Sequence, residues 1–332
     1  MKKGTFIVLT ALLVLSMVFM SCGEPPLTTY TFKLGETHAD GYPTTMGDLR
    51  FAELVEKYTE GRFKVVVEAN AKLGEEKVAI EQVQLGAGVV DMTRVSLSVF
   101  SSFVPETDVL QLPYLYRGQD HMWNVLHSPI GAEMFEAAKK ANFVGLCWME
   151  SGSRNFYTRT LVTKVADLKG MKIRVQQAPV MVDLVTNVGA VATPLPFGEV
   201  YQALKTGVVD GAENNWPSYL SQSHFEGAPF FIEDGHTRVP EILVVSKRLF
   251  DRIPANDQAA ILKAAKETEA YQIDQWNQYE KKAKDEIMTK PGITVTIPAP
   301  EVQADFQKAM QPMYDKQSPA AQAMIKKIQE IK

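Results

Sequence analysis

Two arginines lie in or beside apolar segments, where a guanidinium needs a partner. Arg174 lies inside Ile173-Arg174-Val175, and Arg154 follows the apolar run around Cys147. An arginine is rarely buried unless it is paired, and its planar fork suits two-pronged recognition of a carboxylate. For Arg174 that carboxylate belongs either to the protein, as a structural ion pair, or to a bound ligand. For Arg154 the alternative is a solvated residue at a crossing between domains.

Other polar side chains lie in or near loops that follow predicted strands. They are His38, Arg94, Ser96, Gln176, Asn214, Asn215 and His236. Aromatic residues lie among them in the sequence, namely Phe156, Tyr157, Phe197, Trp216 and Tyr219. A sugar ring binds to such a mixture of flat apolar faces and hydrogen-bonding groups. The alternatives are that the asparagines cap helices, that the aromatic residues form the core, and that the single histidines are structural.

The segments that lead into these loops predict a layered α/β arrangement. Strands are expected at 31–35, 63–67 and 89–92, with a helix at about 45–58 and another from Gly74-Glu75-Glu76. The helix at 45–58 carries apolar residues at near-helical spacing. The order β-α-β-α-β is typical of a mostly parallel sheet covered by helices on both faces.

The same order recurs downstream, which predicts a second, similar lobe. Gly88-Val89-Val90-Asp91 is repeated as Gly207-Val208-Val209-Asp210. Ligands of open α/β sheets bind beyond the carboxyl ends of the strands, so we expect the polar loops of the two lobes to face each other across a cleft. The expected elements of the second lobe are strands at 171–175 and 190–194 and helices at 180–188 and from Phe197-Gly198-Glu199.

The composition excludes several classes of protein. The 332 residues are 45% hydrophobic and 22% charged, which is ordinary for a globular chain, and the length fits two domains. The formal net charge is −4, so we expect no nucleic-acid partner. Motifs of serine hydrolases, phosphate-binding loops and zinc peptidases are absent, and His121 and His127 are poorly spaced for a shared metal. We therefore expect no catalytic residues, no metal and no cofactor.

The N-terminus carries an export signal. Met1-Lys2-Lys3 precedes an apolar stretch at 5–20, and Ser21-Cys22-Gly23 follows. A basic start, a short apolar region and a small residue at the cleavage site are typical of a secretory signal, here residues 1–21. Cys22 resembles the acylated cysteine of a bacterial lipobox, although Phe19 departs from the usual leucine, and the alternative is a plain signal peptide. Lipidation would anchor the protein outside the cytoplasmic membrane.

Five stretches of the chain occur together in one protein family. They are LGEE at 73–76, DVLQLPYLY at 108–116, LKGMKIRV at 168–175, GEVYQAL at 198–204 and GVVDGAENN at 207–215. In this order and spacing they make the chain, from Thr31 to about Tyr279, resemble the DctP family. This family comprises the substrate-binding proteins of tripartite ATP-independent periplasmic (TRAP) transporters. The segments around Glu36, Asn215 and Pro240 resemble the branch that binds hexuronates.

The resemblance implies roles for individual residues. The family's central arginine, which clamps the ligand carboxylate, falls on Arg174, its second arginine on Arg154 and its cleft asparagine on Asn214. Phe197 matches an aromatic residue that packs on the ligand, and Glu76 matches a position that often contacts polar ligand groups.

It also implies a two-lobed periplasmic-binding-protein fold. We expect lobe I to comprise 30–150 plus about 240–270, and lobe II to comprise 151–239 plus the C-terminal helices of about 271–332. A long helix at 259–289 should span both lobes, and residues 22–29 should form a tether after Cys22. Ser96 stands where sialic-acid-binding relatives carry an acidic residue, which disfavours that ligand.

The implied function is capture of a sugar acid, a hexuronate such as glucuronate or galacturonate, by closure of the cleft. The ligand would then pass to the small and large integral-membrane subunits of a TRAP permease. We expect a monomer at the periplasmic face of the bacterial cytoplasmic membrane, held there only by a lipid anchor at Cys22. Two alternatives keep the same fold: a C4-dicarboxylate or another organic acid as ligand, or a sensor role. A secreted enzyme would need paired carboxylates or a nucleophile with its base, and none is expected in the cleft.

Overall fold

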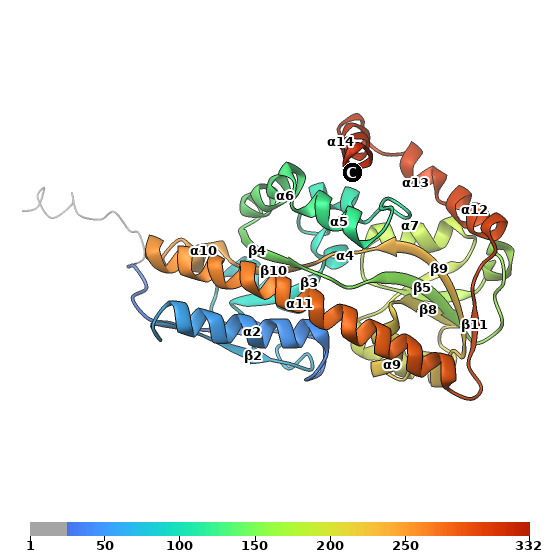
Figure 1. The fold of residues 1–332 in the computed structure, drawn as a ribbon, viewed down its shortest axis with the longest axis horizontal. Helices are drawn as coiled ribbons and strands as arrows, with labels where there is room; N and C mark the ends of the chain where they lie inside the picture. The colour runs from blue at the N-terminus through green and yellow to red at the C-terminus, as the bar shows by residue number, and fades with distance from the viewer. Residues whose placement is uncertain (1–24) are drawn as a thin grey trace, which may run out of the picture.

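The structure, a computed structural model, describes residues 25–332 and arranges them in two α/β lobes, one beside the other (Figure 1). Each lobe has its own sheet covered by helices, which confirms the expected fold class. The predicted signal peptide at 1–21 and the predicted lipidation site Cys22 lie outside the described residues. Within 25–332, no helix combines the length and the apolar character that a bilayer crossing requires.

Lobe I is built on a five-stranded sheet with the order β2-β1-β3-β10-β4. β1, β2 and β3 run parallel, whereas β10 runs antiparallel to both of its neighbours because the chain returns from lobe II to form it. The strands are β1 (Tyr30–Gly35), β2 (Phe63–Glu68), β3 (Met92–Ser96), β4 (Phe143–Met149) and β10 (Glu241–Ser246). The helices are α2 (Pro43–Tyr58), α3 (Glu76–Leu85), α4 (Leu97–Phe100), the 3-10 helix η1 (Pro105–Gln111), α5 (Gln119–Leu126), α6 (Pro129–Lys140) and α10 (Lys247–Phe250).

Lobe II is built on a six-stranded sheet with the order β11-β9-β5-β8-β6-β7. β6 runs parallel to β7 and β8, whereas β5 runs antiparallel to β8 and β9, so this sheet is also more mixed than the sequence suggests. The strands are β5 (Ser153–Thr158), β6 (Lys172–Val175), β7 (Val191–Pro194), β8 (Gly211–Asn214), β9 (Phe230–Arg238) and β11 (Thr294–Thr296). The helices are η2 (Val165–Leu168), α7 (Pro179–Asn187), η3 (Phe197–Glu199), α8 (Val200–Thr206), α9 (Trp216–Ser221) and η4 (His224–Glu226).

The repeated sequence marks the same turn in both lobes. In lobe I the order β2-β1-β3 corresponds to β7-β6-β8 in lobe II. The Asp91 carboxylate accepts a hydrogen bond from the backbone N–H of Lys33 at 2.9 Å, and the Asp210 carboxylate accepts one from Lys172 at 2.8 Å. Each aspartate thus ties the start of one strand to the neighbouring strand. Because Asp91 closes this turn, β3 begins at Met92, later than the strand predicted at 89–92.

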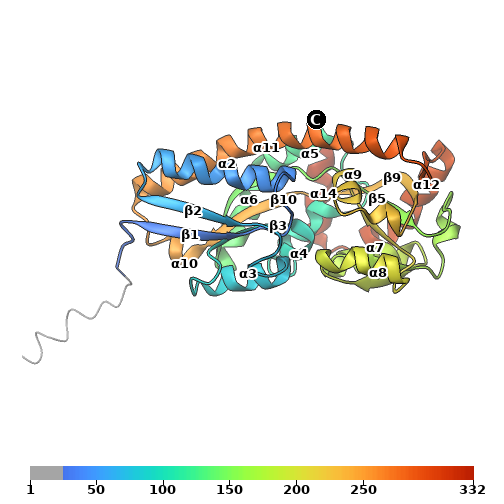
Figure 2. The same cartoon turned by 90° about the horizontal axis from the view of Figure 1, so that it is seen from below.

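Three segments connect the lobes before the C-terminal helices, and a fourth at 316–318 joins α13 (Gln311–Asp315) to α14 (Pro319–Glu330). The chain crosses at 150–152 between β4 and β5, at 239–240 between β9 and β10, and again along α11 (Ala255–Thr289). Figure 2 shows α11 extending along both lobes, where it contacts α2 and β4 of lobe I and α9 of lobe II. The helix predicted at 259–289 is therefore present and begins at Ala255.

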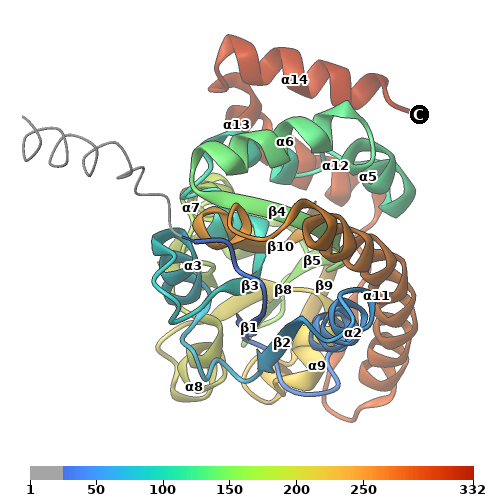
Figure 3. The ribbon, with the colours of Figure 1, turned by 90° about the vertical axis from the view of Figure 1, so that its left-hand side faces the viewer.

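The C-terminal helices do not all belong to lobe II. α12 (Pro300–Ala309) contacts β9 and α13 (Gln311–Asp315) contacts α7, both in lobe II. α14 (Pro319–Glu330) returns to lobe I, where it lies near α5 and α6 (Figure 3) and contacts η1. The assignment of the whole 271–332 segment to lobe II is wrong for this helix, because its buried apolar side, with Ile325 and Ile328, packs against lobe I.

Candidate functional site

A narrow cavity lies between the lobes and is lined by both of them. The space inside it that a water-sized molecule can occupy is only about 20 Å³. Eight predicted site residues line it: His38, Glu76, Arg154, Arg174, Gln176, Phe197, Asn214 and Asn215. The others in the lining are Thr37, Tyr42, Thr44, Ser151, Ser218, Glu241 and Trp276. The predicted residues Arg94, Ser96, Trp216, Tyr219 and His236 are not part of this lining.

Arg174 contributes a buried guanidinium with one unused edge. It lies on β6 with 2% of its surface exposed. Its Nε and Nη2 donate to the carbonyl of Leu195 at 3.0 and 2.6 Å. Its Nη1 is buried and has no hydrogen-bond partner within residues 25–332, and none of the ion pairs in that part of the chain includes Arg174. Burial lowers the pKa of this arginine, which nevertheless stays charged at neutral pH.

Arg154 is buried too, but it is paired with the protein itself. Its Nε donates to one carboxylate oxygen of Glu213, and its Nη2 donates to the other at 2.8 Å. Its Nη1 donates to the Asn214 side-chain oxygen at 3.1 Å. The alternative of a solvated arginine at the domain crossing is therefore excluded. Because two of its three nitrogens hold Glu213, Arg154 orders the cavity wall and reaches the cavity only with its remaining edge.

His236 stands behind the same carboxylate and does not reach the cavity. Its Nδ1 lies 2.9 Å from an Asp234 oxygen, and its Nε2 lies 3.5 Å from Glu213. Burial by itself would lower the pKa of His236, but the charges and hydrogen bonds of Asp234 and Glu213 raise it to about 9. His236 is thus a buried cation that supports the wall, which corrects its expected role as a ligand donor.

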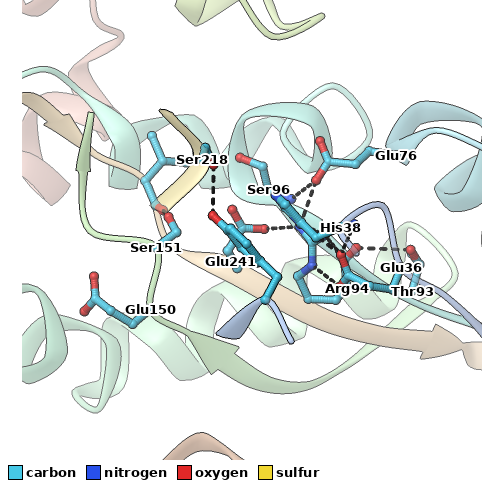
Figure 4. A network of polar contacts seen from close by, with 12 residues as sticks. Glu36, His38, Glu76, Thr93, Arg94, Ser96, Glu150, Ser151, Ser218 and Glu241 are labelled. Carbon is cyan, nitrogen blue, oxygen red and sulfur yellow. Dashed lines mark hydrogen bonds and ion pairs between the residues drawn. The ribbon is translucent and has the colours of Figure 1, made fainter. Parts of the chain in front are cut away.

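Arg94 is the centre of an acidic cluster in lobe I (Figure 4). Its Nε donates to Glu36 at 2.7 Å, and its Nη1 donates to Glu76 at 3.0 Å and to Glu241 at 2.7 Å. Nη2 contacts Glu36 as well. A buried arginine so fully paired cannot bind a ligand carboxylate. The expectation that Arg94 contacts a ligand is therefore wrong. Arg94 has a supporting role instead, because it holds the cavity carboxylates of Glu76 and Glu241 in place.

The cavity accordingly has an acidic wall in lobe I that the sequence reasoning missed. Glu76 begins α3 and Glu241 begins β10, and both line the cavity while sharing the charge of Arg94. Burial raises the pKa of Glu241 to about 7 even though Arg94 opposes this shift. The expectation of no paired carboxylates in the cleft is wrong. The missed signal was a charged residue at the end of an apolar strand, as in Glu241 before Ile242.

A further carboxyl group is buried behind this wall. Asp48 of α2 is fully buried, and neither of its oxygens has a hydrogen-bond partner in the described chain. Burial and the neighbouring charge of Glu36 raise the pKa of Asp48 well above its usual value.

Ring and amide contacts close the cavity around these charges. The His38 ring stacks on Tyr42 with centroids 3.9 Å apart and contacts Phe197 of lobe II at 4.8 Å. The Tyr42 hydroxyl lies 2.9 Å from that of Ser218. Asn215 accepts from the backbone N–H of Ser218 and so caps α9, as its alternative interpretation predicted. The side-chain oxygens of Gln176 and Thr44 are buried without partners, like Nη1 of Arg174.

Three predicted residues belong to the surrounding protein instead. The Trp216 ring stacks on Phe231 at 3.9 Å, and the Tyr219 hydroxyl donates to the carbonyl of Ala228 at 2.8 Å. Both lie in the lobe II core, which was the alternative for the aromatic residues. Ser96 donates its backbone N–H to Glu76 at 2.9 Å, so it orients a cavity residue without lining the cavity.

Comparison with known proteins gives the same fold and one family. The TRAP periplasmic solute-binding protein of Bradyrhizobium sp. BTAi1, solved with α/β-D-galacturonate, is 40% identical with a TM-score of 0.87, covering 91% of this chain and 100% of that one. The one from Roseobacter denitrificans, solved with β-D-glucuronate, is 34% identical with a TM-score of 0.87 at the same coverage. A solute-binding protein of Chromohalobacter salexigens is 34% identical over 88% of this chain and 87% of its own.

The family model for bacterial extracellular solute-binding proteins of family 7, DctP, matches residues 34–319. Family and fold are those of substrate-binding proteins. Since the match covers most of the sequence and the relatives align along almost all of it, the chain belongs to the DctP family of extracellular solute-binding proteins.

Proposed function

We propose that the protein captures a hexuronate, such as glucuronate or galacturonate, between its lobes and delivers it to a TRAP permease. The single observation that carries this proposal is Arg174, a buried cation whose Nη1 has no hydrogen-bond partner in the described chain. A ligand carboxylate would accept from Nη1 of Arg174, with help from the side-chain amide of Asn214, whose oxygen already accepts from Nη1 of Arg154. Charge-assisted hydrogen bonds of this kind contribute roughly 1.5–3 kcal/mol each.

The distribution of charge favours a sugar acid over a dicarboxylate. Arg174 in lobe II provides the positive end of the cavity, whereas Glu76 and Glu241 provide an acidic wall. The hydroxyl groups of a sugar can donate to those carboxylates. A second carboxylate at that wall would meet like charges, which disfavours a C4-dicarboxylate. The close relatives solved with galacturonate and glucuronate support the same choice.

Closure of the cleft follows from where these groups are attached. Glu76, His38 and Tyr42 belong to lobe I, while Arg174 and Phe197 belong to lobe II. A ligand that contacts both sets gains most of its binding energy in the closed form, and only such a difference shifts the equilibrium. The closed protein would be the form that the permease recognises.

We further propose the setting of this activity. The N-terminal sequence supports export and a lipid anchor at Cys22, which would hold a monomer at the periplasmic face of the cytoplasmic membrane. The partners would be the small and large permease subunits. A sensor role would use the same cavity, and neighbouring genes for two membrane subunits would favour transport over sensing. The family of binding proteins also supports a function without catalysis.

A panel of ligands tests the proposal. D-glucuronate, D-galacturonate, D-erythronate, succinate and sialic acid are each added at a hundredfold excess over a micromolar Kd, and thermal unfolding is followed. A hexuronate should raise Tm by roughly 4 °C, because binding at that excess stabilises by about 2.7 kcal/mol. Succinate should raise Tm by less than about 1 °C. A larger shift with succinate than with either hexuronate would contradict the proposal.

A further inference from the structure

A second contact joins the lobes outside the cavity lining. The backbone N–H of Gly198, in η3 of lobe II, donates to Oε1 of Glu75 in lobe I at 3.2 Å. Glu76, the next residue, lines the cavity, as does Phe197, which precedes Gly198. A smaller recess adjoins the cavity here and is lined by Glu75 as well as by Arg174 and Phe197. The contact therefore lies beside the binding site without being part of it.

Glu75 does not perform the task that its position suggests. It occupies the N-cap of α3, where a short polar side chain normally accepts from the first turn of the helix. Its side chain makes no such hydrogen bond and extends to the other lobe instead. The carboxylate is half-buried there, and burial raises its pKa although the amides of Gly198 and Phe197 oppose the shift. Burying part of a carboxylate in this way costs free energy, unless its contact with the other lobe stabilises the closed form.

Gly198 is matched to this carboxylate by its small size. A Cβ at position 198 would lie 2.5 Å from Oε1 of Glu75, which is closer than a real contact allows. The backbone of Gly198 is not among those with positive φ, so an alanine would fit its conformation. An alanine here would displace the Glu75 carboxylate from its position against lobe II.

We propose that the hydrogen bond between Glu75 and Gly198 is a latch that determines how long the closed protein retains its ligand. This inference rests on the proposed function, since a latch matters only if the lobes close on a ligand. Opening the cleft separates the two residues, so the bond exists only in the closed form. It should slow ligand release without affecting the encounter, because the dissociation rate depends on interactions present in the complex.

Kinetics of D-glucuronate binding test the latch. Association and dissociation rates are measured by stopped-flow fluorescence, for which Trp276 in the cavity wall is a natural reporter. Glu75→Ala should accelerate dissociation by roughly three- to tenfold, as expected for a partly exposed charge-assisted hydrogen bond, with association unchanged within twofold. Glu75→Gln keeps an accepting oxygen and should restore slow release. Glu81→Ala, an exposed position on α3, is the matched control and should behave as wild type.

Gly198→Ala supplies the coupled test. Alone it should accelerate release, because its methyl group collides with Glu75, and in the Glu75→Ala background it should add less than twofold. The proposed latch is rejected if the dissociation rate of Glu75→Ala lies within twofold of the wild-type rate. It is overturned equally if Gly198→Ala has the same effect in both backgrounds.

A measurement without ligand separates failure of the latch from failure of the proposed function. If wild type binds neither hexuronate, the ligand assignment is wrong, but closure is still observable. Spin labels at Lys64→Cys in lobe I and Gln202→Cys in lobe II, both exposed, report the distance between the lobes. Glu75→Ala and Gly198→Ala should each increase the population at long distance relative to Glu81→Ala. Unchanged distance distributions in both variants would reject the latch.

Discussion

Arg154 and Arg174 are both buried in lobe II, but only Arg154 is paired with a carboxylate of the protein. Arg154 holds both oxygens of Glu213, whereas Arg174 donates only to the carbonyl of Leu195. Burying an unpaired charge is unfavourable unless a partner arrives. Arg154 thus builds the wall, whereas Arg174 is the cation that the proposed function assigns to a ligand carboxylate.

The first prediction concerns Arg94, which pairs with three acids of lobe I. Arg94→Met removes the charge that Glu36, Glu76 and Glu241 share. Breaking such a buried network should lower the free energy of unfolding by about 3–5 kcal/mol, measured by urea denaturation. Arg50→Met is the control, because Arg50 pairs with Glu53 on the surface and should cost at most about 1 kcal/mol. A loss below 1 kcal/mol in Arg94→Met would show that the acids do not depend on it.

The second prediction concerns the buried acid Asp48. Its pKa is raised in the folded protein, so folding takes up a proton and becomes less favourable as pH rises above about 4. Asn cannot ionise and avoids this cost. Asp48→Asn should therefore be more stable than wild type at pH 8 and no more stable at pH 4, by comparison of Tm. If the difference between the two proteins does not change with pH, Asp48 is not protonated in the folded state.

The third prediction concerns His236, whose contribution to stability also declines as pH rises, but in a higher pH range. The pKa of His236 is raised to about 9, above the value of about 6.5 in an unfolded chain. Its contribution to stability is complete below pH 6.5 and is lost as pH rises through 9. His236→Gln should show a flatter decline of Tm between pH 6.5 and 9 than wild type. Parallel declines in the two proteins would contradict the charged state of His236.

The fourth prediction concerns selectivity. Glu241 lines the cavity with a pKa raised to about 7, so it becomes an anion between pH 6 and 8. The ratio of hexuronate to succinate affinity should rise over that range by at most about tenfold per pH unit. In Glu241→Gln the ratio should be flat, as measured by calorimetric titration. Equal pH dependence in both proteins would remove Glu241 from the selectivity argument.

The sequence predicted those parts of the fold that depend on local pattern. The repeated Gly-Val-Val-Asp turn and the apolar strands around Arg174 led to two lobes. Together with the resemblance to the DctP family, these patterns led to eight of the residues that line the cavity. The role of Arg94 was not predictable, because Glu241 pairs with it across 147 residues. His236 has an acid partner only two residues away, Asp234, but its place behind Glu213 depends on packing that the local sequence pattern does not reveal. Trp216 and Tyr219 were misplaced because an aromatic residue next to a binding loop has the same sequence signal whether it faces the cavity or the core.

Calorimetric titration of Arg174→Met with D-glucuronate and D-galacturonate tests the central claim most directly. Loss of the free cation should weaken binding at least about a hundredfold, since two charge-assisted hydrogen bonds are removed. The ligand-free variant should be at least as stable as wild type, because it no longer buries an unpaired charge. Arg50→Met, which replaces a surface arginine, should bind both hexuronates as wild type does. Binding of either hexuronate by Arg174→Met within threefold of wild type would contradict the account.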